Sequence, residues 1–291
     1  HNDGSNGPEI GLLINCPGLT APLATVGSGP IRCAYRASNN LMYVVSGNAV
    51  YVLTTLWAAT LIGRIGTSTG PVFMVDNPTQ VALVDGAGMW VIVKATNVMT
   101  QTIPTGGADA ASPSSMVYQD GFAIINSTDN QVYQTNYNDL TTIQANGIVN
   151  NAFVQGNAEN VRALYDIKRE VWIFKRDAVE VWVNNGNAGF AFVQLQGVYI
   201  TSGCVAPASI AKLADSMVWL GESELGVAEV YMSSGYQAKP ITTHALSAIF
   251  QTFTTLSDAQ AYTYQSGEHQ FYVLTFPTAN MTFAYDLMTG K

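Results

Sequence analysis

The feature that most constrains the fold is a hairpin pattern that recurs along the chain. Two runs in which apolar residues alternate with others, Val171–Phe174 and Val179–Val183, flank the short polar link Lys175–Ala178. Alternation with a period of two is typical of β-strands, so this stretch predicts an antiparallel hairpin. The same layout returns in Met217–Leu220 and Val227–Met232, which a glycine-containing link separates. A hairpin that recurs at similar spacing indicates a repeat architecture.

Six copies of this hairpin can be found when each is anchored on a large apolar residue of its first strand. The anchors are Tyr43, Trp90, Phe122, Trp172, Trp219 and Tyr272. Most of them are about 40 to 50 residues apart, which is the length of a four-stranded propeller blade. The step from Trp90 to Phe122 is shorter. The sequence therefore predicts an all-β fold, a six-bladed β-propeller with few or no helices.

The chain divides into a leading segment and one propeller domain. Residues 1–30 are rich in Gly, Asn and Pro, and their stretch EIGLLIN is a strand candidate that could pair with another blade. Residues 31–291 are expected to form the propeller, with blade one over Ile31–Ile65 and blade two over Val72–Ile103. The strongest helix signal, Ser209–Leu213, is short and lies where a strand is expected.

Charge and hydropathy restrict the partners of the chain. Twenty acidic residues against twelve basic ones give a formal net charge of −8, which repels a polyanion at long range. We therefore expect no tight nucleic-acid binding. The alternative is a local basic patch formed by Lys168, Arg169, Lys175 and Arg176. No run approaches the roughly 18 consecutive apolar residues that a membrane span needs, so we expect no membrane insertion.

Cysteine and histidine are too few and too scattered to predict a metal site. Cys16, Cys33 and Cys204 show no CxxC spacing, and the chain has three histidines. We expect free, mostly buried thiols, with a Cys16–Cys33 disulfide as the alternative. No metal site and no cofactor site are therefore predicted.

Catalytic patterns are weak. His244 and His269 lack an acidic or serine partner at a diagnostic spacing and are expected to be structural. Ser209 lacks the glycine-flanked elbow of a hydrolase. A glycosidase needs two carboxylates across a cleft, and the candidates are Glu222, Glu224 and Glu229. The sequence thus predicts no catalytic residues, and the chain is not expected to be an enzyme.

The positions of the arginines and two N-glycosylation patterns bear on other functions. A sialidase-type propeller needs arginines that converge from different blades. Here the six arginines fall into two repeats: Arg32, Arg36 and Arg64 in one, and Arg162, Arg169 and Arg176 in the other. The sequences that begin at Asn126 and Asn280 match the N-glycosylation pattern, which is frequent by chance in a chain rich in Asn and Thr.

The second half of the chain carries several motifs in a fixed order. They are EVW at Glu180–Trp182, the GC-A-S pattern from Gly203 to Ser209, WLG at Trp219–Gly221, GYQAKPITTHAL at Gly235–Leu246, E-H-x-F-Y-V-L-T-F-P at Glu268–Pro277, and the closing Asp286–Lys291. In this combination the chain resembles the packaged-DNA stabilisation proteins of short-tailed bacteriophages, the tail accessory or nozzle family. The resemblance is dense over Val161–Lys291 and looser over Gly18–Leu53.

This resemblance implies a β-propeller in a non-enzymatic tail component that self-associates into a ring, extends the portal channel and retains packaged DNA. It implies contacts with the portal or adaptor ring above and with tailspike or tail-needle proteins below. It also implies location in the virion after synthesis in the bacterial host cytoplasm. Relatives of this kind are longer, so we expect this sequence to be a fragment. The alternatives are a generic scaffold propeller, binding proteins through loops such as Pro104–Ser115, and a sialidase-like carbohydrate-active enzyme.

Overall fold

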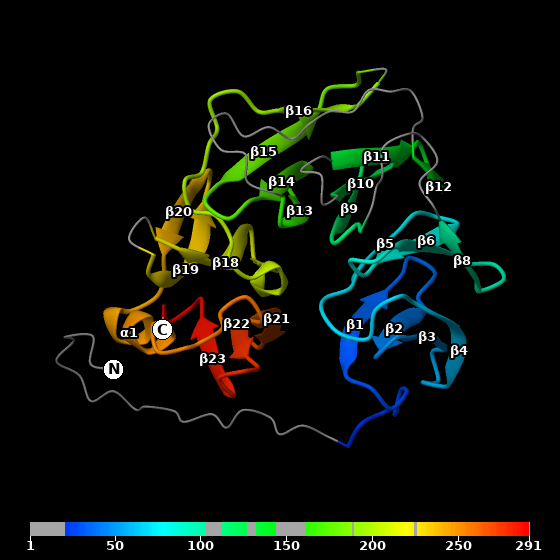
Figure 1. Ribbon diagram of the computed structural model, residues 1–291, viewed down its shortest axis with the longest axis horizontal. Helices are drawn as coiled ribbons and strands as arrows, with labels where there is room; N and C mark the ends of the chain where they lie inside the picture. The colour runs from blue at the N-terminus through cyan, green and yellow to red at the C-terminus, as the bar shows by residue number, and fades with distance from the viewer. Residues whose placement is uncertain are drawn as a thin grey trace.

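The protein is a six-bladed β-propeller, as the hairpin repeat predicted (Figure 1). The computed structural model describes residues 21–102, 112–126, 132–143, 161–187, 189–223 and 226–290. Within these residues the chain forms six sheets, and each sheet uses strands that follow one another in sequence. Tight turns join neighbouring antiparallel strands, which is why each blade is a local unit of the chain. No helix of the described part is long and apolar enough to cross a membrane.

The first three blades have four strands each. Blade 1 contains β1 (Ile31–Arg36), β2 (Met42–Ser46), β3 (Ala49–Leu53) and β4 (Ala59–Arg64). Blade 2 contains β5 (Phe73–Asp76), β6 (Gln80–Val84), β7 (Met89–Val93) and β8 (Val98–Thr102). Blade 3 contains β9 (Met116–Gln119), β10 (Phe122–Asn126), β11 (Val132–Asn136) and β12 (Asp139–Ile143). The predicted extents of blades one and two are confirmed.

The second half of the ring follows the same plan. Blade 4 contains β13 (Ala163–Ile167), β14 (Glu170–Phe174), β15 (Val179–Asn184) and β16 (Phe192–Gln194). Blade 5 contains β17 (Ala211–Leu213), β18 (Ser216–Glu222), β19 (Ala228–Ser234) and β20 (Gln237–Pro240). Blade 6 has three described strands, β21 (Gln260–Ser266), β22 (His269–Phe276) and β23 (Met281–Asp286). The division between residues 1–30 and the propeller stays a prediction, because residues 1–20 lie outside the described part.

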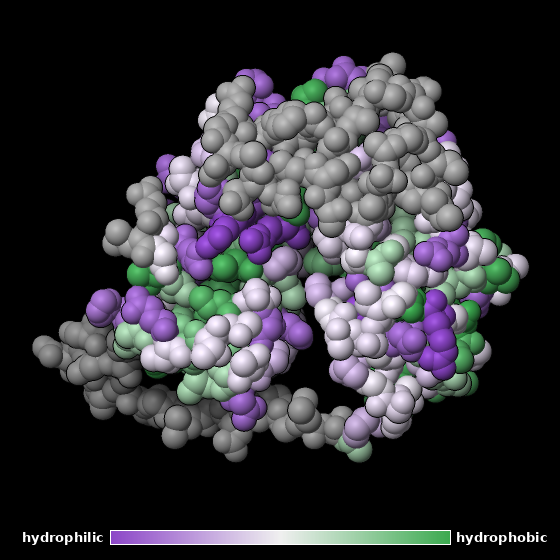
Figure 2. All heavy atoms as spheres, in the orientation of Figure 1, coloured by the Kyte–Doolittle hydropathy of each residue, from purple (hydrophilic) through white to green (hydrophobic). Residues whose placement is uncertain are grey.

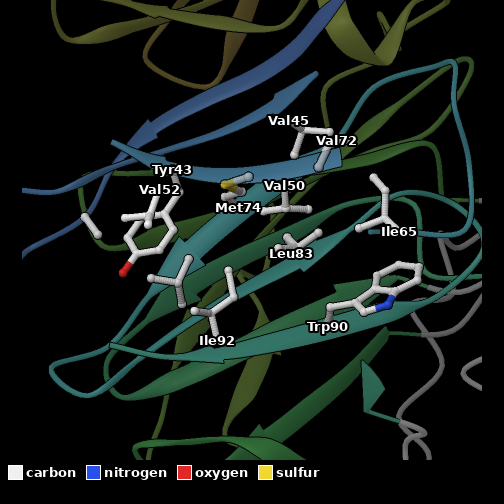
Figure 3. Close-up of a cluster of buried hydrophobic side chains, with 12 residues drawn as sticks. Tyr43, Val45, Val50, Val52, Ile65, Val72, Met74, Leu83, Trp90 and Ile92 are labelled. Carbon is white, nitrogen blue, oxygen red and sulfur yellow. The ribbon is translucent and has the colours of Figure 1, made fainter. Parts of the chain in front are cut away.

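Apolar side chains on facing blades hold the ring together. Five buried clusters join consecutive blades from blade 1 to blade 6, and none of the five joins blade 6 back to blade 1. Figure 3 shows the cluster between blades 1 and 2, where Tyr43 and Val52 of blade 1 face Leu83, Trp90 and Ile92 of blade 2. In Figure 2 an open gap separates the atoms of blade 6 from those of blade 1.

One anchor of the repeat lies in a different strand from the others. Tyr43 and Phe122 fall in the second strand of their blades, whereas Trp90 falls in β7, the third strand of blade 2. The second strand of blade 2 is β6, which begins ten residues earlier at Gln80. The short step from Trp90 to Phe122 is therefore an error in choosing the anchor and not an irregularity of the ring.

Pairing within blade 4 settles which way its tryptophans face. Trp172 lies opposite Val181 and Trp182 lies opposite Val171. Residues directly opposite each other share a face of the sheet, so the two tryptophans point to opposite sides. Trp172 packs in the cluster shared with blade 5, and Trp182 packs in the cluster shared with blade 3.

Within the described residues, two short helical segments interrupt the strands. The expected helix signal near Ser209 is a single 3-10 turn, η1 (Pro207–Ser209), followed by β17. The helix α1 (His244–Phe250), between blades 5 and 6, was not predicted. Its N-cap is Thr243, whose side chain accepts a hydrogen bond from the backbone N–H of Leu246. Phe250 on α1 is buried against Phe276 and Phe283 of blade 6.

Candidate functional site

The centre of the ring holds a cavity of about 560 Å³. Strands β1, β5, β13 and β21 and the turn η1 line it. Arg32 is the only charged side chain among the described residues of this lining, and its guanidinium donates to the carbonyl oxygens of Gly47, Thr67, Thr69 and Gly70. A guanidinium bonded to four carbonyls has few donors left for a ligand. The described lining therefore presents neither a carboxylate pair nor converging arginines.

Aromatic side chains from blades that are not neighbours meet across the channel. Phe73 of blade 2 and Tyr165 of blade 4 pack edge to face, with their ring centroids 6.0 Å apart. Tyr165 also packs against Phe174 of its own blade. Burial raises the pKa of Tyr165, so its hydroxyl stays protonated at neutral pH. A central cavity of about 560 Å³ is far too small for a DNA duplex to pass through the described propeller.

Two of the three candidate bases and nucleophiles, His269 and Ser209, have hydrogen-bond partners among the described residues. Asp286 lies 2.7 Å from Nδ1 of His269, which confirms a hydrogen-bonded histidine. His244 is exposed at the first residue of α1. Ser209 is buried, donates to the carbonyl oxygen of Ala206 and accepts from the N–H of Leu220. With its hydroxyl bonded on both sides, Ser209 is part of the packing between η1 and β18.

The candidate carboxylates do not share a cleft. Glu222 lies 3.5 Å from Arg176, and Glu229 accepts a hydrogen bond from the hydroxyl of Tyr231. Glu224 lies outside the described residues. Glu180 was not among these candidate carboxylates; it is buried and accepts a hydrogen bond from the indole N–H of Trp182. Burial raises the pKa of Glu180.

The cysteines and the glycosylation patterns support a structural interpretation. Cys33 and Cys204 are free thiols, and Cys16 lies outside the described residues. Burial raises the pKa of both thiols to about 12, which leaves them almost entirely protonated at neutral pH. The amide of Asn126 is buried and donates to Ser114 and to the carbonyl oxygen of Val161, so it cannot carry a sugar in the folded chain. Asn280 is exposed in the β22–β23 turn.

The alternative basic patch is not formed. Lys168 and Arg169 lie in the turn before β14, and Lys175 and Arg176 follow its end, about 16 Å away along a five-residue strand. Lys168 lies 3.8 Å from Asp215, and Arg169 lies 2.8 Å from Asp120. The side chain of Lys175 is buried. The four basic residues are too far apart to form one phosphate-binding surface, and the exposed Lys168 and Arg169 each lie beside an acidic residue.

Sequence reasoning missed a buried ion pair of blade 2 that is hydrogen-bonded to blade 1. The ammonium group of Lys94 donates to the carboxylate of Asp76 and to the carbonyl oxygen of Asn77. The same carboxylate accepts hydrogen bonds from Tyr35 at 2.6 Å and from Ser38 of blade 1. Burial opposes ionisation of Asp76, but these hydrogen bonds outweigh it and lower the pKa of Asp76. The group is a structural tie between neighbouring blades.

The most unusual exposed feature is the turn between β3 and β4. The backbone N–H of Thr54 donates to Ala58, and that of Trp57 donates to Thr54, which closes a three-residue loop. Its third residue has a left-handed backbone, where glycine is the usual choice, yet Trp57 stands there with φ +65°. A bulky residue in this conformation costs roughly 1–2 kcal/mol. The side chains of Leu56 and Trp57 are 88% and 41% exposed.

An apolar groove lies on the far side of the ring from that turn. It has a volume of about 200 Å³ and lies between α1 and β23. Apolar side chains of blades 5 and 6 and of α1 dominate its lining, among them Val230, Leu246, Phe250, Phe283 and Tyr285. The sequence contains a signal for the exposed turn, since Leu-Trp is unexpected in a loop. It contains none for the groove, which is built by the four elements β19, α1, β22 and β23.

Comparisons with known proteins agree with the fold. A family model described as "Bacteriophage P22 Gp10, beta-propeller" matches residues 5–291. Among solved structures, the computationally designed protein Ika8 is 11% identical over 92% of this chain and 75% of its own, with a TM-score of 0.54. The extracellular domain of BT4673 from B. thetaiotaomicron is 10% identical over 88% of this chain and 33% of its own, with a TM-score of 0.53. At these identities the two structures show similarity of fold alone. No curated protein matched the chain.

Proposed function

Because this chain belongs to the phage-stabilisation family of the bacteriophage P22 Gp10 β-propeller, we propose that it is a non-enzymatic structural protein of a bacteriophage tail. In this proposal several copies form a ring, or nozzle, that extends the portal channel and retains packaged DNA. The portal or adaptor ring lies above this ring, and tailspike or tail-needle proteins attach below it. The observation that carries the proposal is the family match, which extends over all six blades.

The physical character of the propeller suits this task. Consecutive blades from blade 1 to blade 6 bury apolar faces against one another, which makes the body stiff. The central cavity of the single propeller is too small for a DNA duplex, so in this proposal DNA runs through the lumen formed by several copies. An excess of acidic residues on that lumen would release few counterions from DNA, which favours sliding over gripping.

The proposal is tested by removing the protein from the virion. A phage with an amber codon in this gene is grown without a suppressor, and DNase-resistant DNA per particle is measured before and after purification. We expect particles that package DNA and then lose it, with retention restored when the protein is supplied in trans. Retention equal to that of wild-type particles would contradict the proposal.

The ring itself is tested by electron microscopy of tails assembled with the full-length protein. We expect density for this propeller in a ring with rotational symmetry below the portal. A generic scaffold protein would be absent from the tail. A carbohydrate-active enzyme would bind oligosaccharide at the central cavity, which saturation-transfer NMR with sialylated glycans would detect.

A further inference from the structure

The link between β15 and β16 places an asparagine directly before a glycine on the surface of blade 4. Asn185 and Gly186 are both exposed, and Gly186 has a left-handed backbone with φ +75°. Apart from its two chain neighbours, no heavy atom lies within 4 Å of the position that a Cβ on Gly186 would take. The backbone nitrogen of Gly186 therefore has no side chain beside it. An amide carbon one residue before such a nitrogen is a point where a chain can react with itself.

A hydrogen bond holds the Asn185 side chain in a position that favours this reaction. The backbone N–H of Asn187 donates to Oδ1 of Asn185 at 3.1 Å. A bond from a side chain to the N–H two residues later folds that side chain back over the intervening peptide unit. The same bond would stabilise the negative charge that develops on Oδ1 when a nucleophile adds to the amide carbon. The amide carbon of Asn185 is thus turned toward the Gly186 nitrogen and activated.

The neighbouring Asn184 restrains the nitrogen. The backbone N–H of Gly186 donates to Oδ1 of Asn184 at 2.9 Å, and Nδ2 of Asn184 donates to the carboxylate of Asp120 at 3.1 Å. Because a carboxylate only accepts, Asp120 fixes the Asn184 amide with its oxygen toward Gly186. Arg169 holds Asp120 in turn, at 2.8 Å. The Gly186 nitrogen can lose its proton only after its bond to Asn184 breaks, so Asn184 slows the attack.

We propose that Asn185 is a self-modification site, at which the chain converts this asparagine into aspartate and isoaspartate. Hydroxide removes the N–H proton of Gly186, and the nitrogen then attacks Cγ of Asn185. The new C–N bond closes a succinimide ring, while the Cγ–Nδ2 bond breaks and ammonia leaves with a proton taken from water. Water then opens the ring, giving aspartate when it adds to the side-chain carbonyl and isoaspartate when it adds to the backbone carbonyl. The reaction consumes one water and releases one ammonia, and it needs no oxidant.

The products change the link that carries the outermost strand of blade 4. β16 pairs with β15 up to Asn184, which lies opposite Phe192, and the backbone N–H of Asn185 donates to the carbonyl oxygen of Ala191 at 2.9 Å. Aspartate adds a negative charge at this point. Isoaspartate adds the charge and also routes the main chain through Cγ, which should loosen β16. The reaction needs only this chain and water, so it is independent of the proposed tail function.

The test stores the chain, as its phage encodes it, in mildly alkaline buffer and follows it by tryptic digestion and mass spectrometry. Residues 177–212 form one tryptic peptide, which contains Asn184, Asn185 and Asn187. We expect the acid form at 185 to accumulate, faster as pH rises, and to be labelled in part by isoaspartyl methyltransferase. Asn184 and Asn187, which no glycine follows, should keep their amides. The proposal is overturned if 185 keeps its amide while the synthetic peptide VNNGNA converts completely, or if Asn187 converts as fast as Asn185.

Two variants separate this route from general hydrolysis. Gly186→Asp puts a side chain beside the attacking nitrogen, in a backbone conformation that aspartate tolerates, and should slow conversion about tenfold or more. Asn184→Ala frees the Gly186 N–H and should speed conversion about two- to tenfold, the effect of one hydrogen bond. Tyr199→Ser, an exposed change elsewhere in the same peptide, is the matched control and should leave the rate unchanged. A rate that Gly186→Asp leaves unchanged contradicts attack by this nitrogen, and a rate that Asn184→Ala does not raise contradicts the restraint.

Discussion

Replacing Trp219 with Ala removes the side chain that packs most completely between blades 4 and 5. Trp219 is fully buried, lies edge to face with Phe174 at 5.4 Å between ring centroids, and stacks on Tyr231 at 6.0 Å. Its indole N–H donates to the carbonyl oxygen of Gly203 at 3.0 Å. Loss of burial and the remaining cavity cost about 3–5 kcal/mol. The buried carbonyl left without its donor adds about 1–3 kcal/mol.

The assay is thermal unfolding followed by tryptophan fluorescence and circular dichroism. At about 2–4 °C per kcal/mol for a chain of this size, Trp219→Ala should lower the melting temperature by roughly 10 °C or more. Trp172→Ala should lower it less, because the indole N–H of Trp172 bonds locally to Glu170 in the same strand. Trp57→Ala is the matched control, an exposed tryptophan whose loss should leave the melting temperature nearly unchanged. An unchanged melting temperature in Trp219→Ala would refute the packing argument.

Three further outcomes follow from the interior and the charge. The folded-state pKa of Asp76 is lowered, so the stability it contributes is present above about pH 4 and is lost as pH falls through the folded value. The melting temperature of the wild type should therefore fall more steeply below pH 4 than that of Asp76→Asn; parallel curves would contradict this. Gly203→Ala would place a methyl group 2.3 Å from the backbone carbonyl carbon of Arg176 and should cost about 1–3 kcal/mol, seen as a lower urea midpoint; an unchanged midpoint would mean that the backbones can separate. A short labelled duplex at about 0.1 M salt should show no saturable change in fluorescence anisotropy, whereas salt-sensitive binding at low micromolar protein would reveal a phosphate-gripping surface.

Alternation of apolar and other side chains was enough to predict the hairpins and, for the hairpin of β14 and β15, the register of the paired strands. The link between β14 and β15 closes where it was expected, with Phe174 opposite Val179. Trp90 was assigned to the wrong strand because β6 and β7 are buried on both faces and read as continuous apolar runs. A strand without alternation gives no indication of whether it is second or third in its blade.

The helix α1 could not be found because local signals contribute little to it. It has seven residues, and it carries neither an acidic residue in its first turn nor a basic residue in its last. Such a short helix is marginal on its own, so its stability comes from tertiary packing. Here Phe250 packs against blade 6, a contact between residues that are distant in the sequence.

The hydrogen-bond partners of the candidate residues could not be predicted from the sequence. His269 lies beside Asp286, and the Ser209 hydroxyl donates to the carbonyl oxygen of Ala206. The hydrogen bonds from Tyr35 and Ser38 to Asp76 and the contact between Phe73 and Tyr165 depend on which blades come together in the ring. The separation of these residues along the sequence does not predict that they are close in space.

The two end blades are packed less completely than the others. On the face of blade 6 turned away from blade 5, Tyr264 stacks on Phe271 at 4.9 Å, while Tyr262 and Tyr264 are 57% and 40% exposed. In a repeat fold, stability is approximately a sum of contacts between adjacent repeats, so a blade with one apolar cluster is held less firmly than a blade with two. Blades 1 and 6 are such blades among the described clusters. Blades 1 and 6 are therefore expected to be the least firmly held blades of the described propeller.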